Sequence, residues 1–191
     1  MIIGLCGFAS SGKDAAADYL VKHHGYTRFA FADALKRVAY DCNPWVPVGV
    51  GQLKELGMTA GTVAPLRSLI DNLGDDAKKI PGVRQFYQDW GVAVREHVGA
   101  DAWVDAVLHQ VHCHSPAVIA DCRFPNEADA ISAKGGYIIR VVRPGVVAVN
   151  GHVSERALDD WDDIDGTIYN DGTLDDLGGR VESVLTDLGI L

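Results

Sequence analysis

The amino-acid sequence predicts an α/β fold in which a parallel sheet carries helices on both faces. Apolar runs rich in branched residues at 1–6, 116–124 and 137–145 are typical of buried strands. Segments with helical spacing of apolar residues alternate with these runs along the chain. Because two strands joined through a helix run parallel in one sheet, this order favours a parallel arrangement.

The amino-terminal part of the chain is predicted to contain two strand–helix units. The strand over 1–6 leads through a glycine-rich loop into a helix over 13–24, which Gly25 ends. Residues 26–31 (YTRFAF) are predicted as a second short strand, and 32–42 as a helix that a following proline terminates.

The middle of the chain is predicted to be a helical excursion with an irregular start. Residues 44–52 have the Pro and Gly density of a loop, whereas 64–80 have helical spacing. Two further helices are predicted over 83–99 and 100–114.

The carboxyl-terminal part is predicted to complete the sheet. A helix over 126–136 is followed by the strand 137–145, a polar and acidic stretch, a short strand within 166–172 and an amphipathic helix over 173–191. Two adjacent glycines weaken the prediction of the last helix. Since no linker or repeat divides the chain, we expect a single domain over 1–191.

The composition indicates an ordinary globular protein. The 191 residues are 48% hydrophobic and 23% charged, which suits one domain with a substantial core. The net charge of −9 argues against general affinity for polynucleotides or anionic membranes, because such binding needs a basic face. No apolar run approaches the roughly 20 residues of a membrane span, and the start lacks the features of a signal peptide, so we expect a cytoplasmic protein. The sequence leaves open whether the chain forms a homodimer.

Cysteine and histidine are not arranged as a disulfide framework or a zinc site. The four cysteines are Cys6, Cys42, Cys113 and Cys122. Their wide spacing favours small reduced core residues over disulfides. The cluster HQVHCH, residues 109–114, lacks a second set of ligands at suitable spacing, so a structural zinc ion is not favoured.

The segment GLCGFASSGKDAAADYL, residues 4–20, has the spacing of a phosphate-binding loop. The pattern GxxxxGK begins at Gly7 and is expected roughly 0.08 times by chance in a chain of this composition. It follows the first strand and opens a helix, which is the context that phosphate binding requires. Gly7 and Gly12 permit the tight backbone path, and Ser10, Ser11 and Gly12 offer N–H donors. Lys13 is predicted to bring its charge to the β- and γ-phosphates of ATP.

Asp14 departs from the common loop pattern, which has Ser or Thr at this position. A carboxylate cannot donate a hydrogen bond, but it is a hard oxygen ligand that can hold Mg²⁺ directly or through water. We therefore predict that Asp14 serves the metal ion. The alternative is a carboxylate at a helix start that only interacts favourably with the helix dipole.

Several motifs resemble the phage deoxynucleoside monophosphate kinases, which are P-loop kinases related to adenylate kinase and phosphomevalonate kinase. In chain order the similar segments are GFASSGKDAAADYL, FADALK, VRQFYQDWGVAVRE, DCRFPNEADAISAKGG, IIRVVRPG, HVSE and YNDGTLDDL. The resemblance implies a P-loop NTPase fold with acceptor-binding helices over 32–98 and a lid-like loop over 144–165. It also implies Mg²⁺-dependent transfer of the ATP γ-phosphoryl group to a deoxynucleoside monophosphate. The GKD form of the loop is one of the features that resemble this family. The resemblance therefore supports a functional role for Asp14.

The end of the strand 116–124 carries two candidate site residues. Asp121 lies where the carboxyl edge of a parallel sheet meets the ligand, so it could hold the Mg²⁺ water shell; a capping role is the alternative. Arg123 is placed to bind phosphate and resembles the arginine of the family's DxR motif. A surface arginine is the alternative.

The acceptor is predicted to bind to basic residues in the first half of the chain. Lys36 and Arg37 follow the second predicted strand and could take the acceptor phosphate. Arg84, Gln88 and Arg95 share one face of a helix and could contact the acceptor phosphate and base, or form a solvated surface.

Four further residues are candidates for the site, and the role of each is left open. Asp33 is predicted either to contact the acceptor or to cap the helix that starts near it. Arg143 and Arg156 flank or lie within the lid-like loop, and Arg143 is the preferred candidate for neutralising phosphate charge on closure. Asn170 is predicted either to border the adenine pocket or to form a turn.

Two other functions remain open from the sequence. The first is a P-loop kinase for another small acceptor, such as phosphomevalonate or dephospho-coenzyme A, which would share the loop and the fold. The second is a regulatory module that binds ATP without transferring phosphate. Lys36, Arg84 and Arg123 weigh against the second, because a module for one nucleotide needs no second anion site.

Overall fold

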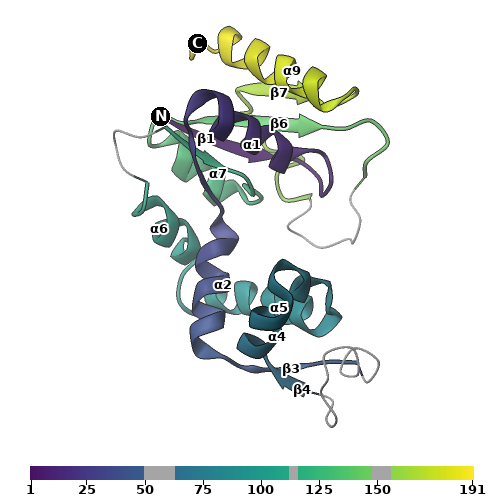
Figure 1. Ribbon diagram of the computed structural model, residues 1–191. Coiled ribbons are helices and arrows are strands. Elements are labelled where there is room, and N and C mark those ends of the chain that lie inside the picture. The colour runs from purple at the N-terminus through teal and green to yellow at the C-terminus, as the bar shows by residue number, and fades with distance from the viewer. Residues whose placement is uncertain (50–62, 112–115, 148–155) are drawn as a thin grey trace. The chain divides into compact units, whose positions relative to one another are not determined.

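A computed structural model describes residues 1–49, 63–111, 116–147 and 156–191 (Figure 1). Its internal contacts divide the chain into two compact units. The first comprises residues 1–31 and 104–191, and the second comprises 32–103. No helix in the described ranges is long and apolar enough to span a membrane.

The first unit contains a five-stranded sheet in the order β2-β5-β1-β6-β7, in which all neighbouring strands are parallel. Its strands are β1 (Ile2–Cys6), β2 (Thr27–Phe29), β5 (Ala117–Ile119), β6 (Tyr137–Val142) and β7 (Gly166–Tyr169). Its helices are α1 (Lys13–His24), α7 (Pro125–Ser132) and α9 (Leu174–Asp187), and α6 (Ala102–Leu108) begins at the unit boundary.

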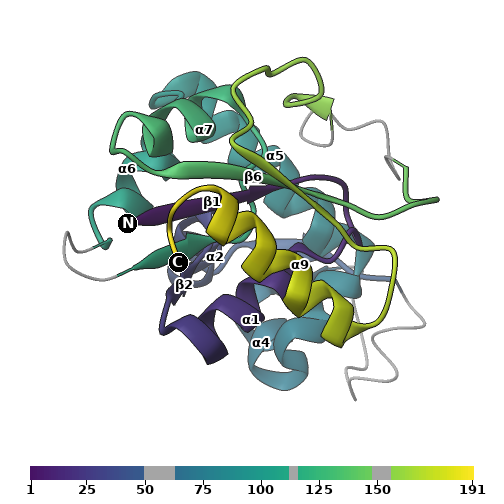
Figure 2. The ribbon, with the colours of Figure 1, turned by 90° about the horizontal axis from the view of Figure 1, so that it is seen from above.

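Helices cover both faces of this sheet, as the sequence predicts. Ile3 and Leu5 of β1 pack in one core cluster with residues of α1 and α9, and these two helices lie side by side (Figure 2). The intervening Gly4 faces α7, since a Cβ added there would lie 2.7 Å from Ile131. Successive residues of β1 therefore pack alternately against the helices on the two faces of the sheet.

The second unit contains the remaining elements. They are α2 (Phe31–Cys42), β3 (Trp45–Pro47), β4 (Val63–Pro65), α4 (Leu66–Leu73), the 3₁₀ helix η1 (Gly74–Lys79) and α5 (Pro81–His97). Val46, Ala64 and Val83 lie in a core of their own with residues of α4 and η1. Gly82 lets α5 approach the backbone of Pro47, with which an added Cβ would collide.

The predicted helices over 100–114 and 126–136 are shorter in the structure, since α6 ends at Leu108 and α7 at Ser132, and three further predicted elements differ in kind or continuity. Residue Phe31, predicted as the end of a strand, is the first residue of α2 and is buried. The predicted loop over 44–52 includes β3, which pairs antiparallel with β4. The predicted helix over 64–80 is divided into α4 and η1 at Gly74, whose φ of 55° stops the α-helix.

The cysteine prediction is confirmed only in part. Cys6 and Cys122 are buried, but Cys42 is exposed at the end of α2, and Cys113 lies outside the described residues. Burial raises the pKa of the Cys6 and Cys122 thiols. Both buried cysteines are therefore protonated and unreactive at neutral pH.

Gly178 and Gly179 of α9, which weaken the sequence prediction of this helix, have different surroundings. A Cβ at Gly178 would collide with the ring of Tyr19 on α1, whereas nothing lies within 4 Å of a Cβ at Gly179. A displacement of the Tyr19 ring would break two contacts. Its hydroxyl donates to Glu182 at 2.8 Å, and its ring stacks on His23 with 4.4 Å between the ring centroids. Gly178 is thus required by the packing of α1 against α9.

These surroundings predict opposite effects of the same substitution at adjacent positions. Gly178→Ala is expected to destabilise the fold by about 1–2 kcal/mol through overpacking. Gly179→Ala is expected to stabilise it by about 0.5–1 kcal/mol, because alanine is the better helix former. Urea unfolding of both variants measures the difference. Equal effects at the two positions would contradict this account of the α1–α9 contact.

Candidate functional site

The loop between β1 and α1 has the backbone conformation that its glycines permit. Gly7, Ser10 and Gly12 have φ values of 128°, 64° and 106°. A Cβ at Gly7 would collide with the carbonyl oxygen of Val141 in β6, and one at Gly12 with the side-chain amide of Asn170. Both glycines are therefore required by conformation and by close packing.

Lys13 is the first residue of α1 and is buried, with 8% of its surface exposed. Its Nζ donates hydrogen bonds to the carbonyl oxygens of Gly7 at 2.8 Å and Phe8 at 2.7 Å. The ammonium group thus lies within the curve of the loop, beside the N-terminal end of a helix. Positive charge and helix dipole act there in the same direction, which favours an anion.

Two further features of the loop bear on ligand binding. The Ser11 hydroxyl is buried and has no hydrogen-bond partner among the described residues. The Asn170 side chain, after β7, donates to the Ser11 carbonyl at 2.8 Å. Asn170 therefore holds the loop through this hydrogen bond. Its position beside the adenine base stays a prediction.

Asp14 forms an ion pair with Arg28 of β2. The other arm of the Arg28 guanidinium donates to Asp18 at 2.6 Å. Asp14 is 81% exposed and Asp18 is 68% exposed. Arg28 is not part of any motif predicted from the sequence. The available signal was the pair of like charges at positions 14 and 18, one helical turn apart, which favours a cation nearby.

Asp121 follows β5 and accepts a hydrogen bond from the backbone N–H of Phe31 at 2.7 Å. Phe31 is the first residue of α2, so Asp121 caps that helix rather than the segment that follows it in sequence. This contact uses Oδ1. The predicted metal role of Asp121 stays a prediction.

Glu127 holds the turn that carries Arg123, and it is not among the residues predicted from the sequence. The residue is 2% exposed, and its carboxylate accepts hydrogen bonds from the backbone N–H groups of Arg123 at 2.7 Å and Phe124 at 3.1 Å. Glu127 is three residues after the N-cap Phe124, with Pro125 between them at the helix start. Phe124 has no side-chain acceptor, so only the glutamate half of a capping box is present, and the available signal was Pro125 followed two residues later by a glutamate.

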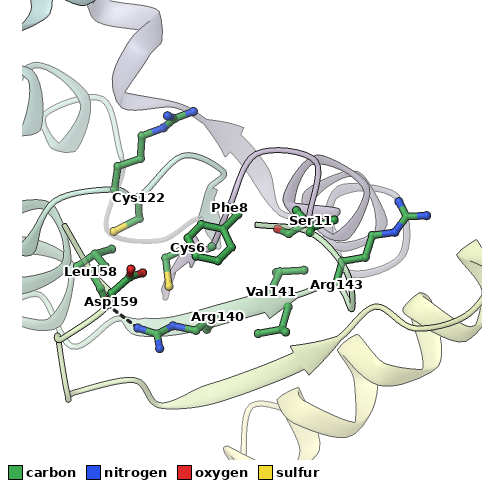
Figure 3. A pocket seen from close by; sticks show the side chains of 13 residues that line it. Cys6, Phe8, Ser11, Cys122, Arg140, Val141, Arg143, Leu158 and Asp159 are labelled. Atoms are coloured by element: carbon green, nitrogen blue, oxygen red, sulfur yellow. Dashed lines mark hydrogen bonds between the residues drawn. The ribbon is translucent and has the colours of Figure 1, made fainter. Parts of the chain in front are cut away.

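A cavity of about 100 Å³ lies beside the loop (Figure 3). It is lined by Cys6, Gly7, Phe8, Ser11, Cys122, Arg123, Arg140, Val141, Val142, Arg143, Val146, Leu158 and Asp159. Three of these side chains are arginines, and two of them, Arg123 and Arg143, were predicted as phosphate ligands. The structure therefore brings both to the cavity that the loop borders.

Arg140 is the third arginine of this cavity and was not predicted. It lies opposite Cys6 in the register of β1 and β6, and its Nη2 donates to the Leu158 carbonyl at 2.6 Å. It thus ties the sheet to the carboxyl-terminal part of the predicted lid-like loop over 144–165. Arg156 of this loop is exposed, and residues 148–155 lie outside the described residues, so the lid prediction stays a prediction.

The predicted acceptor residues lie in the second unit. Asp33, in the first turn of α2, forms an ion pair with Lys36 at 3.1 Å. Arg37 is exposed on the same helix. On α5, Arg84 is exposed and Gln88 is half-buried. The structure therefore leaves Arg37 and Arg84 accessible to solvent.

The rest of the α5 face is partly covered. A Cβ added at Gly91 would lie 2.9 Å from Leu35 of α2, so this point of the face packs closely against the neighbouring helix. Arg95 donates to the Ala100 carbonyl at 3.4 Å, a long hydrogen bond at the end of α5. The predicted face is thus open near Arg84 and closed near Gly91.

The predicted cluster at 109–114 is described only at its start. His109 is exposed, and residues 112–115 lie outside the described ranges. Within those ranges, no group of three or more His, Cys, Asp and Glu side chains is arranged to hold a metal ion.

Comparison with known proteins identifies related sequences. A family model described as deoxynucleotide monophosphate kinase matches residues 54–181, more than half of the chain. A predicted deoxynucleotide monophosphate kinase of Acanthamoeba polyphaga mimivirus is 28% identical over 194 residues, covering 96% of this chain and 95% of the viral protein. The deoxynucleotide monophosphate kinase of Enterobacteria phage T4 is 37% identical over 68 residues, covering 36% of this chain and 28% of the phage protein.

Solved structures of small-molecule kinases align along nearly the whole chain, at low similarity. Dephospho-CoA kinase from Campylobacter jejuni has 11% identity and a TM-score of 0.45, covering 98% of this chain and 96% of that chain. Shikimate kinase from Aquifex aeolicus has 13% identity and a TM-score of 0.42, covering 99% and 96%.

Proposed function

The chain belongs to the deoxynucleotide monophosphate kinase family, and we propose that it transfers the γ-phosphoryl group of ATP to the phosphate of a deoxynucleoside monophosphate. The products are ADP and the deoxynucleoside diphosphate. The observation that carries the donor half of this proposal is the buried Lys13 ammonium within the loop that precedes α1. A buried cation at a helix N-terminus favours the binding of phosphate.

The loop residues fit the donor phosphates. Lys13 would exchange its hydrogen bonds to Gly7 and Phe8 for bonds to phosphate oxygens, and the loop N–H groups would donate to the same oxygens. The Ser11 hydroxyl, which lacks a partner among the described residues, would gain one. Gly7 and Gly12 keep the backbone close enough for these contacts.

Two carboxylates are available for Mg²⁺. The bound ion would neutralise charge on the β- and γ-phosphates. Asp14 and Asp121 would hold it directly or through water, and a site with one or two carboxylates plus phosphate oxygens is the usual arrangement for Mg²⁺. Arg28 and the Phe31 N–H each contact one of these carboxylates and would orient it.

The phosphoryl transfer needs cations around the transferred group more than it needs covalent chemistry. The transition state is loose, with charge on the equatorial oxygens and the attacking and leaving oxygens in line. Lys13, Arg123 and Arg143 would neutralise that charge, since all three lie in or beside the loop and its cavity. We assign these three as the catalytic residues.

The acceptor would bind through the second unit. We assign its phosphate to Lys36 and Arg37 and its base to Arg84 and Gln88. The ion pair of Lys36 with Asp33 supports a role for that carboxylate in orienting the ammonium group toward the acceptor phosphate. Arg95 would contribute at the far end of α5.

The proposed reaction is tested by ADP formation from ATP and Mg²⁺ with a panel of acceptors. The panel holds the four deoxynucleoside monophosphates, the matching ribonucleotides, phosphomevalonate and dephospho-coenzyme A, each against an acceptor-free control. We expect turnover that depends on one or more deoxynucleoside monophosphates. Turnover with phosphomevalonate or dephospho-coenzyme A alone would show that the acceptor is not a deoxynucleoside monophosphate. No turnover with any acceptor would overturn the kinase proposal.

A further inference from the structure

The guanidinium group of Arg28 joins two carboxylates of α1. Nη2 pairs with Oδ1 of Asp14, and Nη1 donates to Oδ1 of Asp18 at 2.6 Å. We propose that Arg28 is the positioning residue for Asp14, holding this carboxylate in the orientation in which it binds the metal ion of the metal–nucleotide complex. The proposal rests on the proposed function, in which Asp14 is a metal ligand.

The sheet register places Arg28 on the α1 side. Arg28 lies opposite Val118 in the pairing of β2 with β5, and Val118 packs in the core cluster that includes Ala16 and Ala17 of α1. Directly opposed residues of neighbouring strands point to the same face of a sheet. Arg28 therefore reaches the side of α1 on which Asp14 and Asp18 lie, one helical turn apart.

The geometry of the contact leaves Asp14 able to bind a metal ion. The ion pair with Arg28 involves Oδ1, and a carboxylate has a second oxygen and about four lone-pair sites in total. Outer partners of this kind orient metal-binding carboxylates, and their loss typically weakens metal binding 10–100-fold. Arg28 also offsets the repulsion between the two carboxylates, which share one face of α1.

The ion pair is expected to contribute little to the stability of the fold. Asp14 is 81% exposed, Asp18 is 68% exposed and Arg28 is 36% exposed. Ion pairs at such exposure contribute little to stability, because solvent screens them and two long side chains lose freedom. Substitution of Arg28 should therefore leave the fold intact, and any effect on metal binding can be read directly.

The test measures metal binding rather than turnover. Mn²⁺, in place of Mg²⁺, is titrated into the protein with a non-hydrolysable ATP analogue, and free Mn²⁺ is followed by electron paramagnetic resonance. Arg28→Gln is expected to raise the Kd for Mn²⁺ about tenfold or more. Arg28→Lys is expected to restore part of the affinity, because a single ammonium group lacks the two-armed geometry of guanidinium. Arg180→Gln, which removes another exposed Arg–Asp pair, serves as the control with unchanged Kd.

A double-mutant comparison separates positioning from a general charge effect. If Arg28 acts through Asp14, Arg28→Gln adds no further loss of Mn²⁺ affinity to Asp14→Asn. An unchanged or lower Kd in Arg28→Gln would overturn the proposal, as would an equal loss in both backgrounds. An unchanged Kd in Asp14→Asn would overturn it too. The kinase proposal is tested separately, by ADP formation with the unaltered protein and the acceptor panel.

Discussion

Replacement of Lys13 by methionine is expected to lower kcat by about 10²-fold or more while the chain stays folded. Lys13 is the buried cation of the loop, and its Nζ contacts the Gly7 and Phe8 carbonyls. Methionine keeps most of the apolar side-chain volume, so the packing of the loop changes little. The charge that would stabilise the transferred phosphoryl group is lost. The measurement is ADP formation at saturating ATP, Mg²⁺ and the preferred acceptor.

Lys22→Met is the matched control for this loss of charge. Lys22 is in the last turn of the same helix and is exposed, so its substitution should leave kcat near its original value. Circular dichroism of both variants checks that helix content is kept. Near-normal kcat in Lys13→Met would rule out phosphoryl transfer at this loop, whereas equal losses in both variants would indicate a nonspecific charge effect.

The first unit was predictable from the sequence because its signals are local. Branched apolar runs marked β1, β5 and β6, and Gly25, with φ 68°, ended α1 as expected. The loop residues were found in the same way, since the GxxxxGK spacing, the preceding strand and the following helix are contiguous. Local patterns of this kind depend little on the rest of the chain.

The second unit was harder because prolines and glycines conceal its short elements. Pro47 and Pro65 terminate the paired segments of β3 and β4, and proline is normally evidence against a strand. A two-stranded ribbon tolerates them, because an edge position does not require every backbone N–H. Gly74 divides a stretch whose apolar spacing continues through η1, so periodicity alone predicted one helix.

Three residues owe their roles to tertiary contacts that no sequence motif describes. They are Arg28, Arg140 and Glu127. Arg28 is recognised only when β2 is placed beside α1, and Arg140 only when its register opposite Cys6 is known. Both contacts depend on strand order, which the sequence pattern left open. Glu127 differs, because Pro125 followed by an acidic residue marks a helix start in the sequence, but only its burial and its hydrogen bonds show that it supports the turn with Arg123.

Replacement of Glu127 by alanine is expected to reduce both stability and turnover. The substitution removes the acceptor of the Arg123 and Phe124 N–H groups and leaves a small cavity, at a cost of about 3 kcal/mol in the free energy of unfolding. It also frees the turn that holds Arg123 at the cavity, and a displacement of about 1 Å at such a residue can cost about 10²-fold in rate. Urea unfolding and kcat/KM, measured where each variant is folded, give the two effects.

Glu127→Gln and Arg123→Ala determine whether the loss of rate passes through Arg123. Glutamine keeps a carbonyl oxygen for the two N–H groups, so it should retain most of the stability and much of the turnover. If Glu127 acts by placing Arg123, the double variant Glu127→Ala/Arg123→Ala should have the kcat/KM of Arg123→Ala alone. A further loss in the double variant would show that the turn serves catalysis through another group, such as Asp121, which precedes Arg123 by two residues. The stability loss would persist in either case, because it arises from the buried N–H groups and not from the guanidinium.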